Sequence, residues 1–585
     1  MHSSNEISNT SQSTAGSRPT ISVWARNVFF CGLCATGAIA VAGFLMDYDP
    51  GSQFSTLAQP IASRDSVSIE TSNVTSDLTP VKQTIDLVDA AFDETWRDAR
   101  LQTADTVDHL TYARRMSLGL AGTVPSLEEL RVLESVPSDL RNERWLEHLL
   151  ADDRTNLFLA ERLARAFVGV EDGPFLVYRR SRFVSWLAQQ LKQNVPYDQI
   201  VRQLITENGT WTQSPAVNFY SKTIDQNEDK NQVDPILLAG RTSRAFLGMR
   251  IDCLQCHDDF LGNVNLGDPE DPSGGQQTDF HSLAAFFSGT EMSLGGVHSS
   301  RDPVPWRVQL LGNSDESNVP PVLPFLRKLD GGESDPRLRL ANWVTHRQNR
   351  PFARSIINRM WAIVYGKPLV DPVDDIPLAG PFPKPLEIMV DDFVASQYDL
   401  RRAITVIASC KPGRLDSRAA FEITYPHGEN FAVFPMRRLR PDQVAGAIVQ
   451  SSSLTTINSQ AHILDRLMKF GSKNEFVERF GDPGESEFEQ RGETVTQKLL
   501  MMNGSMLSDR INEGMHSVVH LAGLSPDAEK LLETIFLTVL SRRPTTEEQS
   551  HFIPSIDATS GDQRKERAQD IYWALVNSVE FTWNH

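Results

Sequence analysis

The pentapeptide Cys253-Leu254-Gln255-Cys256-His257 constrains this chain of 585 residues more than any other feature. The spacing C-x-x-C-H is the one through which proteins hold a c-type haem. Two thiols bond to the haem vinyl groups, and the histidine supplies an axial nitrogen to the iron. We therefore predict covalent haem c at Cys253 and Cys256, with His257 as the axial ligand. The sixth iron ligand is open, and its candidates are Met292, His281 and His298.

The sequence before the motif predicts a helix. Leu237 to Ile251 carries apolar residues near helical spacing, so we expect the motif at or near the end of that helix. If the helix continued, Cys253, Cys256 and His257 would share one face. That face could also supply three ligands to zinc or another metal, or hold a structural disulfide without any cofactor. Asp258 or Asp259 would be the fourth metal ligand.

The N-terminal part predicts export. Val28 to Met46 is an uncharged apolar run, long enough to cross a hydrocarbon core of about 30 Å as a helix. Arg18 and Arg26 precede it, so the positive-inside rule places residues 1–27 in the cytoplasm and the bulk of the chain on the periplasmic side of the inner membrane. Haem attachment is possible there. The alternative is a cleaved signal peptide, because Ala40-Val41-Ala42 resembles a processing site.

Composition excludes several classes of protein. The net charge is −18, and no basic stripe appears, which argues against binding to nucleic acid. Of five cysteines, two belong to the motif, so no disulfide framework remains and a hydrophobic core must hold the exported part. The chain contains no nucleophile elbow, phosphate-binding glycine loop or zinc-protease helix motif.

The rest of the chain reads as a helical protein. Residues 47–84 form a Ser/Thr-rich stretch that we interpret as a flexible linker. Beyond it, capping boxes at Ser126–Glu129 and Thr545–Glu548 predict helix starts, and Asn349-Arg350-Pro351 separates two helices. Alternating strand patterns are scarce. We expect a mainly α, multi-helix globular region with minor β structure, after one transmembrane helix and a tether.

Longer segments resemble a known pair of domains. The segments in the first half are 111–130, 194–198, 240–260 and 284–287, and those in the second half are 350–376, 392–396, 438–443, 499–511, 541–548 and 573–585. On these segments the first half resembles the planctomycete cytochrome-C-type domain of unknown function, and the second half looks like the companion domain that follows it. The resemblance implies a cytochrome-C-type domain at 85–300 and a helical companion domain at 320–585. The activity of that family is not established.

The chain departs from the family pattern at several positions. Family members commonly read C-x-x-C-H-[DN]-H, whereas this chain has Asp259 at the second histidine position. A companion-domain stretch that often carries cysteine reads Ser486 to Arg491 here, without cysteine. No smaller cytochrome domain precedes residue 85. The resemblance therefore implies that any redox partner is another protein.

Three functions are compatible with these features. The leading hypothesis is a membrane-anchored, exported c-type cytochrome-like protein that transfers electrons or serves a redox step in the cell envelope. An alternative is an exported metal-dependent enzyme acting on envelope or polysaccharide substrates, with Asp371, Asp374 and Asp375 as acidic candidates that ion pairs or helix capping also explain. The third is a non-catalytic scaffold with a structural thiol or metal motif. Whether the protein is an enzyme stays open.

Overall fold

The computed structural model describes residues 78–170, 177–224, 233–268, 271–293, 295–300, 304–457, 476–482, 484, 487–489, 492–504, 506–507 and 518–585. The expected cytoplasmic tail, the apolar run 28–46 and nearly all of the expected linker lie outside these residues. Within the described ranges, no helix is long and apolar enough to cross a membrane. The membrane anchor stays a prediction.

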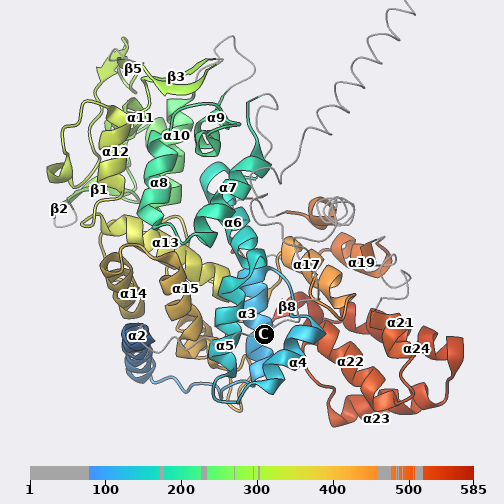
Figure 1. The fold of residues 1–585 in the computed structure, drawn as a ribbon. Helices are drawn as coiled ribbons and strands as arrows, with labels where there is room; N and C mark the ends of the chain where they lie inside the picture. Colours follow the sequence, from blue (N-terminus) through green and yellow to red (C-terminus); the bar gives the residue numbers. More distant parts are fainter. Residues whose placement is uncertain are drawn as a thin grey trace, which may run out of the picture. The chain divides into compact units, whose positions relative to one another are not determined.

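The described chain is mainly helical, as predicted (Figure 1). The helices of the first half are α2 (Leu78–Asp98), α3 (His109–Ala121), α4 (Leu127–Ser135), α5 (Arg141–Ala151), α6 (Asp153–Val168), α7 (Arg180–Lys192), α8 (Tyr197–Thr206), α9 (Asn218–Ser221), α10 (Pro235–Thr242) and α11 (Gln277–Ala285). Those of the second half are α12 (Pro336–Val344), α13 (Arg350–Tyr365), α14 (Lys384–Ala395), α15 (Leu400–Ser409), α16 (Tyr425–Glu429), α17 (Pro441–Ser451), α19 (Val495–Asn503), α21 (Val518–Gly523), α22 (Ala528–Leu540), α23 (Thr546–Asp557) and α24 (Gly561–Val576).

The β structure of the described residues is limited to short antiparallel pairs. The pairs are β1 (Asn265–Asp268) with β2 (Asp271–Gly274), β3 (Thr290–Ser293) with β4 (Gly296–Ser299), β5 (Trp306–Val308) with β6 (Ser317–Val319), and β7 (Arg437–Arg438) with β8 (Trp583–Asn584). Minor β structure was expected, and this expectation is confirmed.

Local signals position the helix ends. The Ser126 hydroxyl accepts from the backbone N–H of Glu129, and the Glu129 carboxylate accepts from the N–H of Ser126, so the predicted capping box starts α4. Thr545 and Glu548 form the same box at α23. The predicted break also exists, because α12 ends at Val344 and α13 begins at Arg350. These motifs act within four residues, so sequence alone predicts them.

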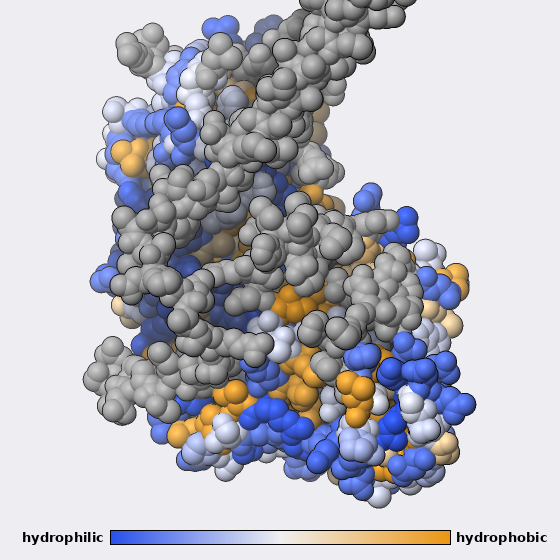
Figure 2. All heavy atoms as spheres, turned by 45° about the vertical axis from the view of Figure 1, so that its right-hand side comes forward, coloured by the Kyte–Doolittle hydropathy of each residue, from blue (hydrophilic) through white to orange (hydrophobic). Residues whose placement is uncertain are grey.

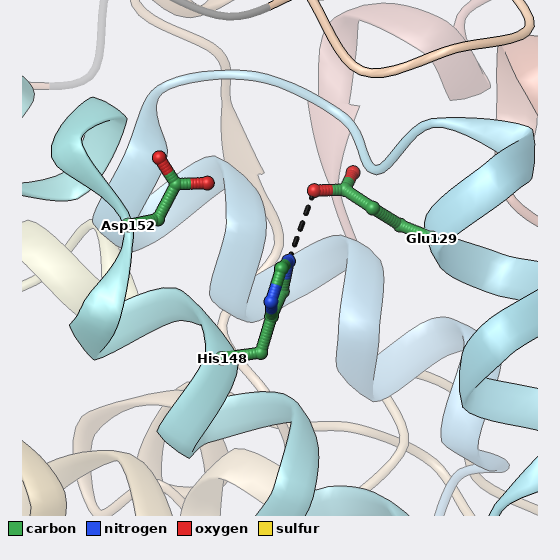
Figure 3. Close-up of side chains that lie close together, drawn as sticks. All are labelled: Glu129, His148 and Asp152. Atoms are coloured by element: carbon green, nitrogen blue, oxygen red, sulfur yellow. Dashed lines mark hydrogen bonds and ion pairs between the residues drawn. The ribbon is translucent and has the colours of Figure 1, made fainter. Parts of the chain in front are cut away.

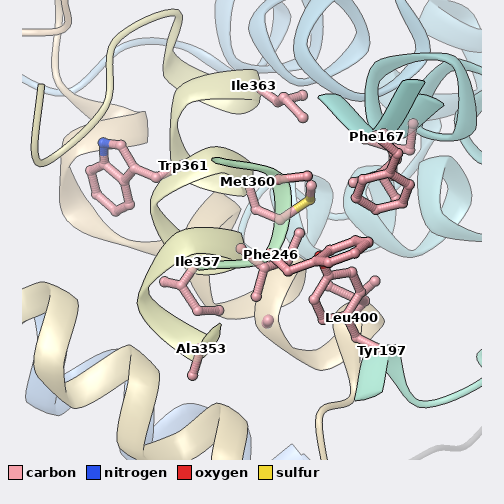
Figure 4. Packing of buried hydrophobic residues seen from close by; sticks show 14 of the residues in the cluster. Phe167, Tyr197, Phe246, Ala353, Ile357, Met360, Trp361, Ile363 and Leu400 are labelled. Atoms are coloured by element: carbon pink, nitrogen blue, oxygen red, sulfur yellow. The ribbon is translucent and has the colours of Figure 1, made fainter. Parts of the chain in front are cut away.

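Two clusters of buried apolar residues hold the fold. The first surrounds α13, which buries residues on all of its faces, including Phe352, Met360 and Trp361 (Figure 4). A helix that is apolar all round must lie inside the core. The second cluster is formed mainly by α17, α22 and α24. Both clusters draw on residues from before 300 and from after 320. The residues that the structure describes, from Leu78 onwards, accordingly belong to one compact unit.

Two buried arginines on α3 tie the early helices to the C-terminal end. Arg114 donates to the carbonyls of Val539 (3.0 Å) and Phe581 (3.2 Å). Arg115 is fully buried and donates to the carbonyls of Gly413, Leu415 and His585 at 3.2, 2.6 and 2.7 Å. Since a buried guanidinium needs acceptors for its N–H groups, these carbonyls fix the relative position of segments that are hundreds of residues apart.

The surface carries both apolar and hydrophilic side chains. Figure 2 brings the side of the C-terminal helices forward and shows apolar patches between hydrophilic residues on this face. Exposed apolar side chains of α19 and α24 include Val495, Leu499 and Trp573. The indole N–H of Trp573 donates to the carbonyl of Met502 at 3.3 Å, which joins the two helices.

Candidate functional site: the C-x-x-C-H turn

The helix before the motif ends at Gly248 and does not continue into the motif. Helix α10 passes into a single π-helical turn, Ser243–Leu247, and stops at Gly248, whose φ of 65° lies in the left-handed region. The Gly248 carbonyl accepts from the N–H of Ile376 at 2.6 Å. The motif therefore begins on a separate 3-10 turn, Asp252–Gln255, and Cys256 and His257 follow the end of that turn, so the arrangement expected for a continuing helix does not form.

Hydrogen bonds from α11 hold this turn in place. Leu254, the residue after the first cysteine, is completely buried. The Gln255 carbonyl, between the two cysteines, accepts from the side-chain amide of Gln277 (3.1 Å) and from Nε2 of His281 (3.0 Å). Because both donors come from α11, the backbone between the cysteines is held against a helix.

His281 is part of this support. Since a carbonyl can only accept, its Nε2 carries the proton, and its Nδ1 accepts from the indole N–H of Trp306 at 3.4 Å. The ring is 1% exposed, and burial lowers its pKa below the usual 6.5. Both ring nitrogens are thus engaged within the protein. His281 supports the motif turn in this arrangement, and its role as a sixth ligand stays a prediction.

The three motif side chains face solvent. Cys253, Cys256 and His257 are exposed, and both thiols are free. Burial of part of the thiol, together with the negative charge of Asp259, raises the pKa of Cys253. Nδ1 of His257 lies 2.7 Å from the carbonyl of Asp258 and must donate to it. The lone pair of His257 Nε2 therefore remains available.

The two aspartates after the motif are engaged with backbone N–H groups. Asp258 Oδ1 accepts from the N–H of Gln277 at 2.7 Å. Asp259 accepts from the N–H groups of Leu261 (3.1 Å) and Val264 (2.6 Å). Asp259, which stands at the second histidine position of the family pattern, therefore closes the following turn.

The other candidate ligands lie on the β3–β4 hairpin. Met292 on β3 is partly buried and packs against the first core cluster. His298 on β4 pairs across the hairpin with Glu291, at 3.5 Å between Nε2 and Oε2. The choice of a sixth ligand stays a prediction.

The acidic segment after α13 contacts the residues that lead into the motif. Asp374 Oδ1 accepts from Nε and one terminal nitrogen of Arg250, at 3.2 and 2.9 Å. Arg250 stands shortly before Cys253, so this ion pair connects the second half of the chain to the motif segment. Asp374 therefore has an ion-pair role, and burial raises the pKa of Asp375.

Sequence reasoning missed one polar cluster. Glu129, His148 and Asp152 bring ligand-type atoms within 4.8 Å of one another (Figure 3). His148 Nε2 lies 3.1 Å from Glu129 Oε1, while Arg154 pairs with both carboxylates. Burial raises the pKa of Glu129, but the His148 hydrogen bond and the Arg154 charge outweigh burial and bring it to about 2. The guanidinium already supplies the cation, so we interpret the cluster as structural.

Comparisons with known proteins match two successive segments of the chain to family models. Residues 87–292 match a family model described as a protein of unknown function (DUF1549). Residues 336–554 match a second one, described as a protein of unknown function (DUF1553). Searches of curated proteins and of solved structures gave no match. The chain therefore carries a DUF1549 domain followed by a DUF1553 domain, a planctomycete-associated pair of unknown function.

Proposed function

We propose that the exposed turn at Cys253–His257 carries a covalent c-type haem and that the protein acts in electron transfer or another redox step in the cell envelope. The observation that carries this proposal is the C-x-x-C-H spacing on an anchored turn whose two thiols and imidazole all face outward. A haem would supply a one-electron redox centre there.

The hydrogen bonding of His257 supports this proposal. Its Nδ1 proton is directed to the Asp258 carbonyl, and such a second hydrogen bond fixes which ring nitrogen is free to bind a metal. Phe260 and Leu261 follow the motif and are 77% and 84% exposed. The Phe260 ring stacks on His257, with centroids 6.1 Å apart. Exposed apolar side chains beside the motif favour an apolar macrocycle as their cover.

The same geometry disfavours a compact zinc centre. A tetrahedral zinc site needs four ligand atoms about 2 Å from one ion. Among the described residues, only the cluster around Glu129 brings three such atoms within 4.8 Å of one another, and the motif side chains do not. The nearby carboxylates of Asp258 and Asp259 already accept backbone hydrogen bonds. Haem attachment requires no such convergence, because the thiols bond to separate vinyl groups.

The proposal also includes the membrane anchor and a separate redox partner. An anchor at 28–46 would place the turn on the periplasmic side, where a separate redox protein would exchange electrons with it, and nucleic acid would not be a partner. Nothing in the described residues favours the enzyme or scaffold alternatives over this reading. The acidic candidate Asp374 is committed to Arg250.

Haem staining of a denaturing gel tests the proposal. The full chain would be expressed with a c-type haem maturation system, beside a C253A/C256A double variant. The variant C410A is the matched control, because Cys410 is a completely buried free cysteine outside the motif. We expect peroxidase staining for wild type and C410A and none for the double variant. Unstained, correctly exported wild-type protein would refute the proposal.

A further inference from the structure

We propose that a cleft between the DUF1549 and DUF1553 domains binds an oxyanion group (a carboxylate, phosphate or sulfate) through Arg359. The cleft is small and partly open to solvent, and the space that the centre of a water molecule can occupy in it is about 20 Å³. The charged residues that line it are Arg165, Arg241, Arg244, Arg359, Asp374 and Glu487. Arginines therefore outnumber carboxylates in the lining.

Both carboxylates are committed to arginines outside the lining. Asp374 accepts from Arg250 at 2.9 Å. Glu487 Oε2 accepts from Arg162 at 2.7 Å. Glu487 also lies 3.9 Å from Nε of the lining residue Arg165 and compensates part of that charge. Neither carboxylate pairs with Arg359, whose positive charge therefore makes the cleft favour an anion over a cation.

Arg359 is the residue that lacks a counterion. It extends from α13, is 6% exposed, and its Nε has no hydrogen-bond acceptor. No hydrogen bond or ion pair connects it to another residue in the described part of the chain. A buried charge without a partner is costly, and an entering anion removes that cost. The planar guanidinium can donate two parallel hydrogen bonds to an oxyanion.

An adjoining cavity extends the positive surface. It also borders on Glu487 and is lined by Arg437, Arg438 and Arg440. Arg440 is 7% exposed, and two of its nitrogens lack hydrogen-bond acceptors, although Asp442 lies 4.0 Å from its Nε. Arg438 pairs with Glu493 at 2.9 Å. In a chain of net charge −18, such a local concentration of arginine is suited to an anionic ligand.

The cleft also has a connection to the motif turn. Arg244, in the cleft wall, pairs with Asp252 at 3.5 Å, and Asp252 is the residue before Cys253. Arg165, Arg241 and Arg244 belong to the first matched domain, whereas Arg359 belongs to the second. A ligand bound here would hold the two domains together. The inference does not depend on haem at Cys253.

The test measures thermal unfolding of the full chain in sodium sulfate against sodium chloride at equal ionic strength. Sulfate stabilises proteins generally, so the diagnostic signal is a saturable rise in Tm above the linear trend. We expect this rise in wild type and in R418Q, where an exposed arginine outside the cleft lining is replaced, and its loss in R359M. The variant R359K keeps the charge but lacks the planar guanidinium that donates two parallel hydrogen bonds. It should bind sulfate several-fold more weakly.

Two further observations complete the test. Because R359M removes a buried, unpaired charge, it should unfold at a higher temperature than wild type in chloride, so a loss of the sulfate effect cannot be ascribed to misfolding. Glucuronate serves as a second probe with one carboxylate on a sugar ring. A response to sulfate would indicate a free oxyanion as the ligand, and a response to glucuronate alone would indicate an acidic group on a larger molecule. No saturable response to either probe would overturn the proposal.

Discussion

At the scale of single residues, hydrogen bonds to the Gln255 carbonyl hold the motif turn in place. It receives hydrogen bonds from Gln277 and His281, and His281 in turn accepts from Trp306. Leu254 is the buried side chain of the motif, whereas the side chains of Cys253, Cys256 and His257 are exposed. The position of the thiols therefore depends on one carbonyl and one neutral imidazole.

Replacing His281 with phenylalanine should change the pH dependence of stability. Burial lowers the pKa of His281 below 6.5 in the folded protein, so the unfolded chain binds its proton first as the pH falls. Stability from this residue is complete above pH 6.5 and is lost at lower pH. Urea unfolding at pH 7.5 and 5.5 should show a smaller difference for H281F than for wild type. H298F is the control, and an equal change in that variant would contradict this role.

Glu129 supplies a second titrating contact. Its pKa of about 2 in the folded protein, against 4.5 ordinarily, stabilises the fold by about 3 kcal/mol at neutral pH. That contribution is present above pH 4.5 and is lost as the pH falls towards 2. E129Q should therefore lower the free energy of unfolding at pH 7 and flatten its decline in acid, as measured by denaturant titration. The control is E147Q, which should have little effect because Glu147 is half-exposed and pairs with Arg144 on the surface of the same helix.

At the scale of elements, the point where α10 ends determines how the motif is presented. The π-helical turn and left-handed Gly248 reverse the chain, and Gly248 lies against Ser355 and Ile376. A β-carbon there would lie 3.1 Å from Ser355 Cβ. The chain could not continue helically through this point with the same packing.

The variant G248A tests this claim. The left-handed conformation costs a non-glycine residue about 1–2 kcal/mol, and the crowding against Ser355 adds to it. We expect a lower Tm and faster alkylation of Cys253 and Cys256 in the protein without haem. G428A is a suitable control, because nothing lies near the β-carbon that it would add. Equal Tm values for the two variants would show that Gly248 is not required.

Elements were predictable from sequence where their signals are local. The capping boxes at Ser126 and Thr545 and the break at Pro351 follow from neighbouring residues. The separate turn that carries the motif was not predictable, because the apolar spacing up to Ile251 does not reveal that Gly248 adopts positive φ. The support from His281 depends on where α11 packs. For the same reason, Glu129 was recognised as a cap but not as the partner of His148 and Arg154.

At the scale of the whole molecule, the two matched domains share their core. Arg114 and Arg115 on α3 donate to carbonyls beyond residue 410, and α13 packs against helices of the first domain. Such contacts lie far apart in sequence, and no pattern within either segment predicts them. The domains are therefore expected to unfold together.

Replacing Arg115 tests this coupling. R115M leaves two buried carbonyls and one partly buried carbonyl without this donor, which should cost about 3 kcal/mol. Urea unfolding followed by tryptophan fluorescence and by circular dichroism should give one coincident transition in wild type, shifted to lower urea in R115M. The control variant R418M replaces an exposed arginine and should unfold like wild type. Two separate transitions in wild type would show that the domains fold independently.

The most direct measurement of the central claim is a pyridine haemochrome spectrum of the purified, denatured full chain after maturation. If Cys253 and Cys256 hold haem c, the spectrum will show thioether-linked haem at one equivalent per chain in wild type, and none in C253A/C256A. Wild-type protein that is exported and folded but gives no haemochrome band would contradict the claim.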